Sequence, residues 1–229
     1  MSTAPGVTPG MADPRLHMLH LASPALPVGA YAYSQGLEYA IEAGWLEGEA
    51  LHDWLRDSLL LGQACLDMPM LLRASEALAR NDQATLDRWN NRLLASRETA
   101  ELLLEDSQMG AALWRLLGKL EIPDLPALSQ APAYAVAFAV ACEHWKIGTN
   151  EALQALGYSW LENQVTAATK LVPLGQSAAQ RLLLELLEYI PEACDTARAI
   201  DDESLGLSLP GLAIASCRHE RQHTRLFRS

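Results

Sequence analysis

Residues 21–38, LASPALPVGAYAYSQGLE, combine an irregular backbone with an apolar composition. Pro24 and Pro27 each lack a backbone donor and push the preceding residue towards extended geometry, so no regular helix or strand is expected to run through the segment. Gly29 is suited to a positive φ or to a close backbone approach. Because the residues between these breakers are apolar and aromatic, we expect the segment to be packed against other elements rather than solvated.

Composition favours helices throughout the remainder of the chain. Half of the 229 residues are apolar, so a substantial core can form. Alanine and leucine dominate, while β-branched residues are sparse, which favours helix over sheet. The formal net charge of −11 argues against nucleic acid as a partner. The most apolar run, residues 131–142, is about half the length that a membrane-spanning helix needs.

The termini and cysteines favour a cytoplasmic protein. Residues 1–14 lack the basic and apolar regions of a signal peptide and are expected to form a flexible tail. The four cysteines form no CxxC pair, and we interpret them as reduced, mostly buried thiols (Cys65, Cys142, Cys194 and Cys217).

Apolar spacing predicts an all-α fold, a single-domain helical bundle of roughly eight to ten helices over residues 15–229. Within residues 21–38, a helix is expected to resume near Ser34, with Leu37, Ile41 and Trp45 on one face. The other predicted helices cover residues 15–21, 47–63, 70–80, 83–95, 98–117, 131–145, 149–171 and 174–190, with breaks at Pro69 and Pro173. Residues 118–132 contain three prolines and are either a linker or a helix–helix loop.

The C-terminal segment, residues 210–229, is unusually rich in arginine. Four of the fourteen arginines lie in the last twelve residues of an otherwise acidic chain, and Leu226 and Phe227 stand beside them as apolar anchors. Arginine suits bidentate pairing with carboxylates and is enriched at interfaces. The alternative is a solvated basic end. The segment's cations include Arg218, Arg225 and Arg228.

Three other motifs have both a structural and a functional interpretation. Arg97 and Glu101, at i,i+4, could form an ion pair on a solvated helix face. Lys170 precedes a proline-broken junction, where the helix dipole favours a cation. His219 and His223, also at i,i+4, are weak candidates for a metal site, which needs three or more ligands.

No catalytic motif is present. The sequence has no GxSxG, HExxH or phosphate-loop pattern, so we expect no enzymatic activity.

Four strings in this chain resemble the signatures of the UreF family of urease accessory proteins. They are SPALPVGAYAYSQGLE from Ser23, the ASRET and DSQMG segments around residues 95–110, KLVPLGQ from Lys170, and the RHE and TRLFRS ending. The resemblance covers nearly the whole chain after about residue 15. One departure is Ala213, which stands where family members commonly have aspartate.

The resemblance implies a function through partners. It implies an all-α protein, usually a homodimer, that binds UreD and recruits the GTPase UreG into a GTP-dependent chaperone complex that inserts nickel into apo-urease. Nickel would be the cargo of the complex, UreG would bind the GTP, and this chain would need no cofactor. The C-terminal tail would engage UreD and is expected to be mobile until UreD binds. A rival interpretation is a helical nickel carrier that uses the C-terminal His/Cys cluster.

The resemblance also assigns roles to particular residues. Tyr31 and Arg225 would face UreG, and Lys170 would be partner-facing or act as a finger towards the GTPase. Together the partner-binding set is Tyr31, Lys170, Arg218, Arg225, Leu226, Phe227 and Arg228. The set expected to shape and hold the fold is Pro27, Gly29, Arg97, Glu98, Pro173 and Gly175, with Arg97 and Glu98 keeping neighbouring helices in register.

Overall fold

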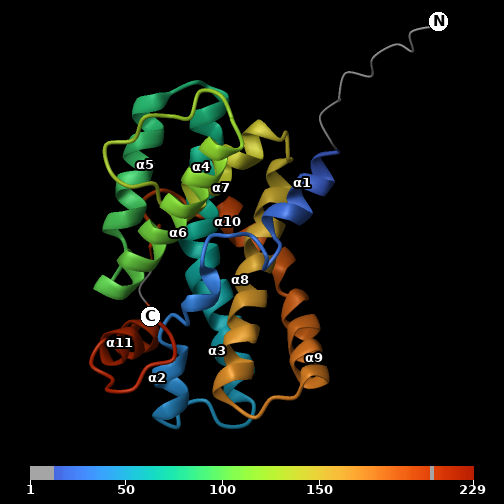
Figure 1. Ribbon diagram of the computed structural model, residues 1–229, viewed down its shortest axis with the longest axis vertical. Coiled ribbons are helices and arrows are strands. Elements are labelled where there is room, and N and C mark those ends of the chain that lie inside the picture. Colours follow the sequence, from blue (N-terminus) through green and yellow to red (C-terminus); the bar gives the residue numbers. More distant parts are fainter. Residues whose placement is uncertain (1–12, 207–208) are drawn as a thin grey trace, which may run out of the picture.

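The computed structural model describes residues 13–206 and 209–229, and every regular element within these ranges is helical (Figure 1). This confirms the all-α prediction. The predicted flexible tail falls mainly on residues 1–12, outside the described ranges. The α-helices of the described ranges are α1 (Pro14–Leu21), α2 (Leu37–Glu42), α3 (Ala50–Asp57), α4 (Asp67–Ala79), α5 (Gln83–Ala95), α6 (Ala100–Lys119), α7 (Tyr134–His144), α8 (Thr149–Leu171), α9 (Gln176–Leu187), α10 (Ile190–Ala199) and α11 (Pro210–His219).

Helix starts follow from local side-chain chemistry. The Asp82 carboxylate accepts a hydrogen bond from the Thr85 amide at 3.0 Å and caps α5, while the Thr99 hydroxyl caps α6. Pro69 was expected to be a helix break, but it lies within the first turn of α4, where its missing N–H is not needed. The break occurs just before α4 instead, where a π-helical turn (Ser58–Gly62) and a 3₁₀ turn (Gln63–Cys65) follow α3.

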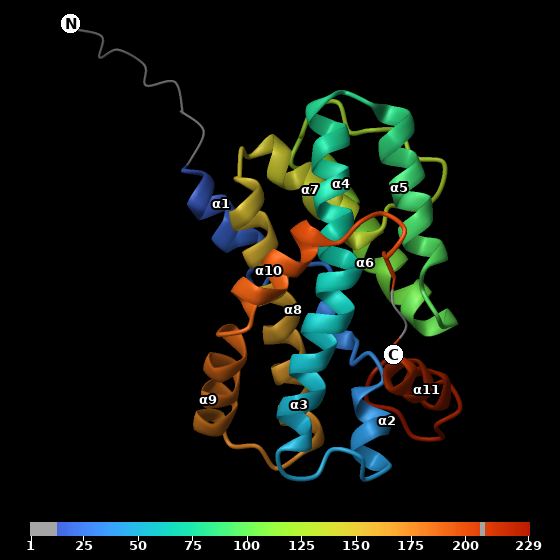
Figure 2. The same ribbon diagram turned by 180° about the vertical axis from the view of Figure 1, so that it is seen from behind.

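The core is built around α7, which packs between α4 and α6 (Figures 1 and 2). Residues 135–142 of α7 are all buried, as its apolar sequence predicts. The close packing with α6 depends on Gly110, since a Cβ atom there would lie 1.9 Å from the Pro132 carbonyl oxygen. Residues 120–133 form the loop that joins α6 to α7.

The irregular N-terminal segment crosses the molecule between α1 and α2 and is packed as expected. Leu26, Val28 and Tyr33 are buried, whereas Tyr31 is 68% exposed. A 3₁₀ turn, Ala30–Ala32, follows Gly29, whose φ is +82°. Helix α2 ends at Glu42, so the prediction that Trp45 continues its apolar face is wrong.

Helix α11 lies beside α2 in both views and also contacts α6 (Figures 1 and 2). A Cβ atom on Gly36 would lie 2.8 Å from the Ser216 amide nitrogen, so only glycine permits this approach without displacement. The contact therefore joins the N-terminal and C-terminal parts of the chain.

Candidate functional site

A surface groove gathers five of the seven residues predicted to bind partners. Tyr31, Lys170, Leu226, Phe227 and Arg228 line it, together with Arg115 of α6. We call this the basic groove. Its walls come from the N-terminal segment, α6, the end of α8 and the C-terminal tail, so it unites residues of all four family-like strings. The remaining two predicted residues, Arg218 and Arg225, are not among its lining residues.

Tyr31 is held at the rim of the groove by the segment around it. The adjacent Tyr33 is buried and donates its hydroxyl hydrogen to Gln108 Oε1 at 2.5 Å. The Asn163 side chain of α8 donates to the Tyr33 carbonyl oxygen at 3.3 Å. Tyr33 therefore fixes the backbone to α6 and α8, while the Tyr31 ring remains accessible.

The tail is docked onto the N-terminal half of the chain. The buried Glu38 carboxylate accepts hydrogen bonds from the Leu226 and Phe227 amides at 2.7 and 2.9 Å. The Arg228 amide donates to the Ala32 carbonyl oxygen at 2.8 Å. Phe227 is buried, and the Lys170 amine lies 5.3 Å from the centre of its ring. Mobility of the tail before UreD binds stays a prediction.

Ser229 is held by hydrogen bonds through both its backbone and its side chain. Both the amide and the hydroxyl of Ser34 donate to the Ser229 backbone oxygen, at 2.8 and 2.5 Å. The Ser229 hydroxyl in turn donates to Glu105 Oε2 at 2.7 Å, and the Gln35 side chain donates to Glu105 Oε1 at 2.8 Å. Burial raises the pKa of Glu105 to about 7, despite these hydrogen bonds and the charge of Arg97.

His219 joins two further carboxylates beneath the tail. Its Nδ1 lies 2.8 Å from Glu101 and its Nε2 lies 3.1 Å from Glu38, and the ring is fully buried. Arg225 pairs with the other oxygen of Glu101 at 2.8 Å. Three carboxylates, those of Glu38, Glu101 and Glu105, thus anchor the tail.

These contacts remove the basis for the predicted metal pair. Helix α11 ends at His219, so His223 does not follow it one turn later on a helical face. Both ring nitrogens of His219 already face carboxylate oxygens. Across residues 13–206 and 209–229, no group of three or more His, Cys, Asp or Glu side chains is arranged to hold a metal ion.

Arg97 has different partners from the one that its spacing suggests. Its guanidinium pairs with Asp67 of α4 and with Asp106 of α6, 2.9 Å from Oδ2 of the latter, and not with Glu101. Burial disfavours the guanidinium charge, but the two carboxylates outweigh this and raise the pKa of Arg97. Asp106 also accepts a hydrogen bond from the Tyr134 amide at 2.7 Å. The cluster is therefore a buried tie between α4, α6 and the start of α7, rather than part of a solvated face.

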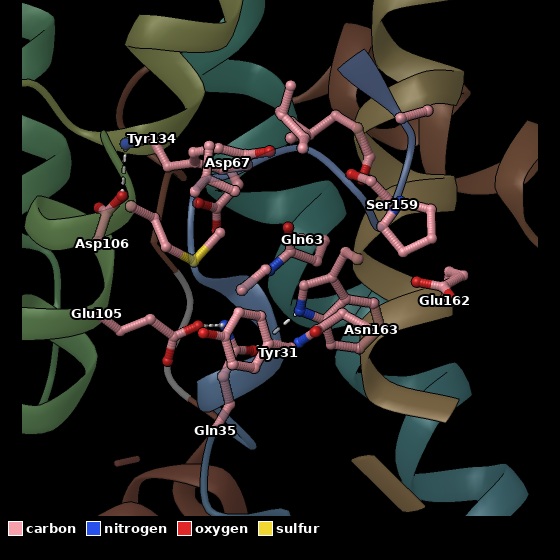
Figure 3. Close-up of a pocket in the computed structure, with 18 of the residues that line it drawn as sticks. Tyr31, Gln35, Gln63, Asp67, Glu105, Asp106, Tyr134, Ser159, Glu162 and Asn163 are labelled. Carbon is pink, nitrogen blue, oxygen red and sulfur yellow. Dashed lines mark hydrogen bonds between the residues drawn. The ribbon is translucent and has the colours of Figure 1, made fainter. Parts of the chain in front are cut away.

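A cavity adjoins this cluster and shares Tyr31 with the basic groove (Figure 3). In the close-up, Glu105 and Asp106 lie on one side, and Glu162 and Asn163 of α8 lie on the other. The N-terminal segment covers it with apolar side chains such as Leu26. Tyr31 thus stands at a boundary between the outer surface and the interior.

The other predicted residues lie away from the groove, apart from Gly29, which is part of its lining. Arg218 is exposed on α11, and Glu98 lies in the exposed link between α5 and α6. Pro27, Pro173 and Gly175 lie in exposed turns, and Gly175 is the N-cap residue of α9. Their structural roles stay predictions.

Sequence reasoning missed Glu38, Glu101 and Glu105 as tail anchors, Gly36 as the contact point for α11, and Arg115 as a groove residue. For Glu38, the available signal in the sequence was its place as the last residue of the family-like string SPALPVGAYAYSQGLE.

All four cysteines are free thiols, and three are buried, as predicted; Cys217 is exposed. None of the helices in the described ranges is both long enough and apolar enough to cross a bilayer.

Comparison with known proteins gives a consistent result. The family model for UreF matches residues 47–187. The urease accessory protein UreF of Teredinibacter turnerae is 52% identical over 217 residues, covering 93% of this chain and 98% of that protein. The UreF of Chromohalobacter salexigens is 46% identical, covering 93% of each chain. That of Azoarcus sp. is 47% identical across the full length of both.

These relatives are named as accessory proteins of urease and not as enzymes. The match extends beyond the family model to the N-terminal segment and the tail, which form the basic groove together with α6 and α8. The all-helical fold agrees with the resemblance drawn from the four strings. The chain belongs to the UreF family of urease accessory proteins.

Proposed function

We propose that this chain binds UreD and recruits the GTPase UreG, in a complex that inserts nickel into apo-urease. The observation that carries the proposal is the basic groove, where Tyr31 and the tail residues Leu226 and Arg228 are brought together from opposite ends of the sequence. An accessory protein that acts by binding other proteins needs a site of this kind, built from several segments of the chain. In this proposal nickel passes as cargo of the complex, and the nucleotide is bound by UreG.

Lys170 has a partner-facing role in this proposal. Its amine is held over the Phe227 ring at the groove wall, which favours surface recognition over insertion into a nucleotide site. A finger cation contributes about 10³–10⁵ in hydrolysis rate. We therefore expect Lys170→Ala to reduce the rate of GTP hydrolysis by UreG far less than this factor. The rate is compared with that of the wild-type complex at saturating protein concentration. A loss of about 10³ or more in single-turnover rate would restore the finger role.

Co-purification with UreD and UreG tests the proposal directly. We expect wild-type chain to retain both partners and Tyr31→Ala to lose UreG, because Tyr31 is the most exposed aromatic side chain at the groove. Removal of residues 218–229 should abolish complex formation and urease activation. Tyr158→Ala on α8 serves as a control for the loss of an aromatic ring outside the groove. Normal assembly and activation by the truncated chain would overturn the proposal.

We also propose that the protein is a cytoplasmic homodimer. The free thiols suit a reducing compartment. Leu16 and Leu19 on α1 are 59% and 61% exposed and offer apolar surface for self-association. Sedimentation equilibrium should give twice the chain mass, and a monomer at all concentrations tested would contradict this.

The nickel-carrier alternative gains no support from the tail. His219 has both ring nitrogens engaged by carboxylates, so coordinating a metal would require breaking a buried network. Equilibrium dialysis distinguishes the two functions. Tight stoichiometric nickel binding that disappears in His219→Ala and His223→Ala would favour the carrier.

A further inference from the structure

The basic groove has a charge opposite to that of the whole molecule. The chain has 28 acidic residues and 17 Lys and Arg residues. Yet Arg115, Lys170 and Arg228 line the groove, and no Asp or Glu side chain is among the described residues that line it. Three cations from α6, α8 and the tail therefore converge where composition alone predicts an excess of acids.

These cations have no acidic partner within the described chain. Elsewhere several arginines pair with carboxylates, as at Arg73, Arg198 and Arg225, whereas Arg181 and Arg218 are exposed and form no ion pair in the described ranges. Arg115 and Lys170 are exposed and form no ion pair in the described ranges. The contact between Lys170 and the Phe227 ring positions the amine without neutralising it.

Apolar side chains stand next to the cations. Tyr31 and Leu226 are 68% and 62% exposed at the same groove. An occupant that covers the groove must therefore offer apolar contact as well as negative charge. The net charge of −11 disfavours binding of a nucleic acid, because its long phosphate backbone is also negative. A phosphate backbone also offers no apolar side chain to contact Tyr31 and Leu226.

We propose that the basic groove binds an acidic segment of a partner protein, a stretch in which carboxylates flank an apolar side chain. The carboxylates pair with Arg115 and Lys170, and the apolar side chain lies between Tyr31 and Leu226. This inference rests on the proposed function, because the partner is sought within the UreD and UreG complex. It adds the chemistry of the occupant and a recognition role for Arg115.

Zero-length carbodiimide coupling reads out this contact, because it joins a lysine amine to a carboxylate only when the two touch. The chain has three lysines, Lys119, Lys146 and Lys170. In the assembled complex with UreD and UreG, we expect mass spectrometry to find Lys170 joined to an Asp or Glu of a partner. Lys170→Arg keeps the charge and should retain the complex while losing this cross-link.

Lys119 and Lys146 provide internal controls. Both are exposed and lie outside the groove lining, so their coupling to a partner should be weaker than that of Lys170. Cross-links from Lys170 to a second copy of this chain, or none from Lys170 in a complex that forms, would overturn the inference.

Charge reversal gives an independent readout. Arg115→Glu should weaken partner binding about ten-fold or more, and the wild-type Kd should rise with salt between about 50 and 500 mM. Lys119→Glu, four residues further along α6 and outside the groove, is the matched control and should bind as wild type. Circular dichroism establishes that both variants fold.

The two levels of the proposal fail differently. If the wild-type chain forms no complex with UreD and UreG, the proposed function fails and this inference fails with it. If the complex forms and Tyr31→Ala weakens it, while Arg115→Glu binds normally and salt has no effect, only the acidic-segment inference is overturned.

Discussion

Glu105 is a carboxyl group that the fold holds away from water, directly beneath the tail. Its pKa is raised by burial to about 7, against an ordinary value of 4.5. Between these two pH values the folded chain binds a proton that the unfolded chain has released. The free energy of unfolding should therefore fall as pH rises through this window and level off above about pH 7.

Denaturant unfolding between pH 5 and pH 8 checks this slope, and Glu105→Gln should make it shallower. Some slope should remain, because burial also raises the pKa of Asp106. Glu192→Gln, an exposed acid on α10, should leave the slope as in wild type. An equally steep slope in Glu105→Gln would show that another group is responsible.

Arg97 is the second residue whose environment fixes its role. Arg97→Ala would leave the carboxylates of Asp67 and Asp106 buried without a cation, at a cost of about 3–5 kcal/mol of stability. Thermal or denaturant unfolding measures the loss. Arg56→Ala removes only exposed pairs with Asp53 and Asp57 and should cost much less. A loss for Arg97→Ala no larger than that control would contradict the role assigned to the buried tie.

At the scale of elements, the packing of α6 against the start of α7 depends on Gly110, which has no side chain. In Gly110→Ala the new Cβ would meet the Pro132 carbonyl oxygen at 1.9 Å, so the loop before α7 must shift. We expect the free energy of unfolding to fall by about 1–3 kcal/mol or more, as at other overpacked sites.

The same helix supplies a matched control for this prediction. A Cβ on Gly118 would meet its nearest atom at 3.8 Å, an ordinary contact, so Gly118→Ala should be neutral or stabilising by up to about 1 kcal/mol. Unfolding of both variants under one condition gives the comparison. Equal stabilities would show that the close approach at Gly110 is not needed.

Helix positions could be predicted from sequence where the signals are local. Residues 149–171 were predicted as one helix, and α8 has those bounds, because the apolar pattern ends at Pro173. The tail could not be predicted in this way. The contacts of His219 with Glu38 and Glu101 span 181 and 118 positions, and no spacing rule connects such residues. Five groove residues within the family-like strings were predicted. Ser107 and Gln108, in the DSQMG string, and Arg115, outside the strings, were missed.

Across the whole molecule, the tail and the N-terminal segment stabilise each other through the α2–α11 contact. Gly36→Ala combines a positive φ of 78° with a Cβ 2.8 Å from the Ser216 amide, so it should loosen α11 and the residues after it. Gly44→Ala carries similar backbone strain, at φ +73°, but its Cβ has nothing closer than 3.9 Å.

Limited trypsin digestion distinguishes these two variants, because Arg221 and Arg225 lie in the tail. Cleavage there should be faster in Gly36→Ala than in Gly44→Ala or in wild type. In all three, bound UreD should slow it, as the predicted ordering of the tail by UreD requires. Equal rates in the two glycine variants would show that the α2–α11 contact does not hold the tail.

The hydrogen bonds between Ser34 and Ser229 have a consequence for protein synthesis. A ribosome makes Ser34 early, but the acceptor of its hydrogen bonds is present only after 195 further residues have been added. A nascent or prematurely terminated chain therefore lacks one wall of the basic groove. We therefore expect such unfinished chains to bind the proposed partners less tightly than chains that include residue 229.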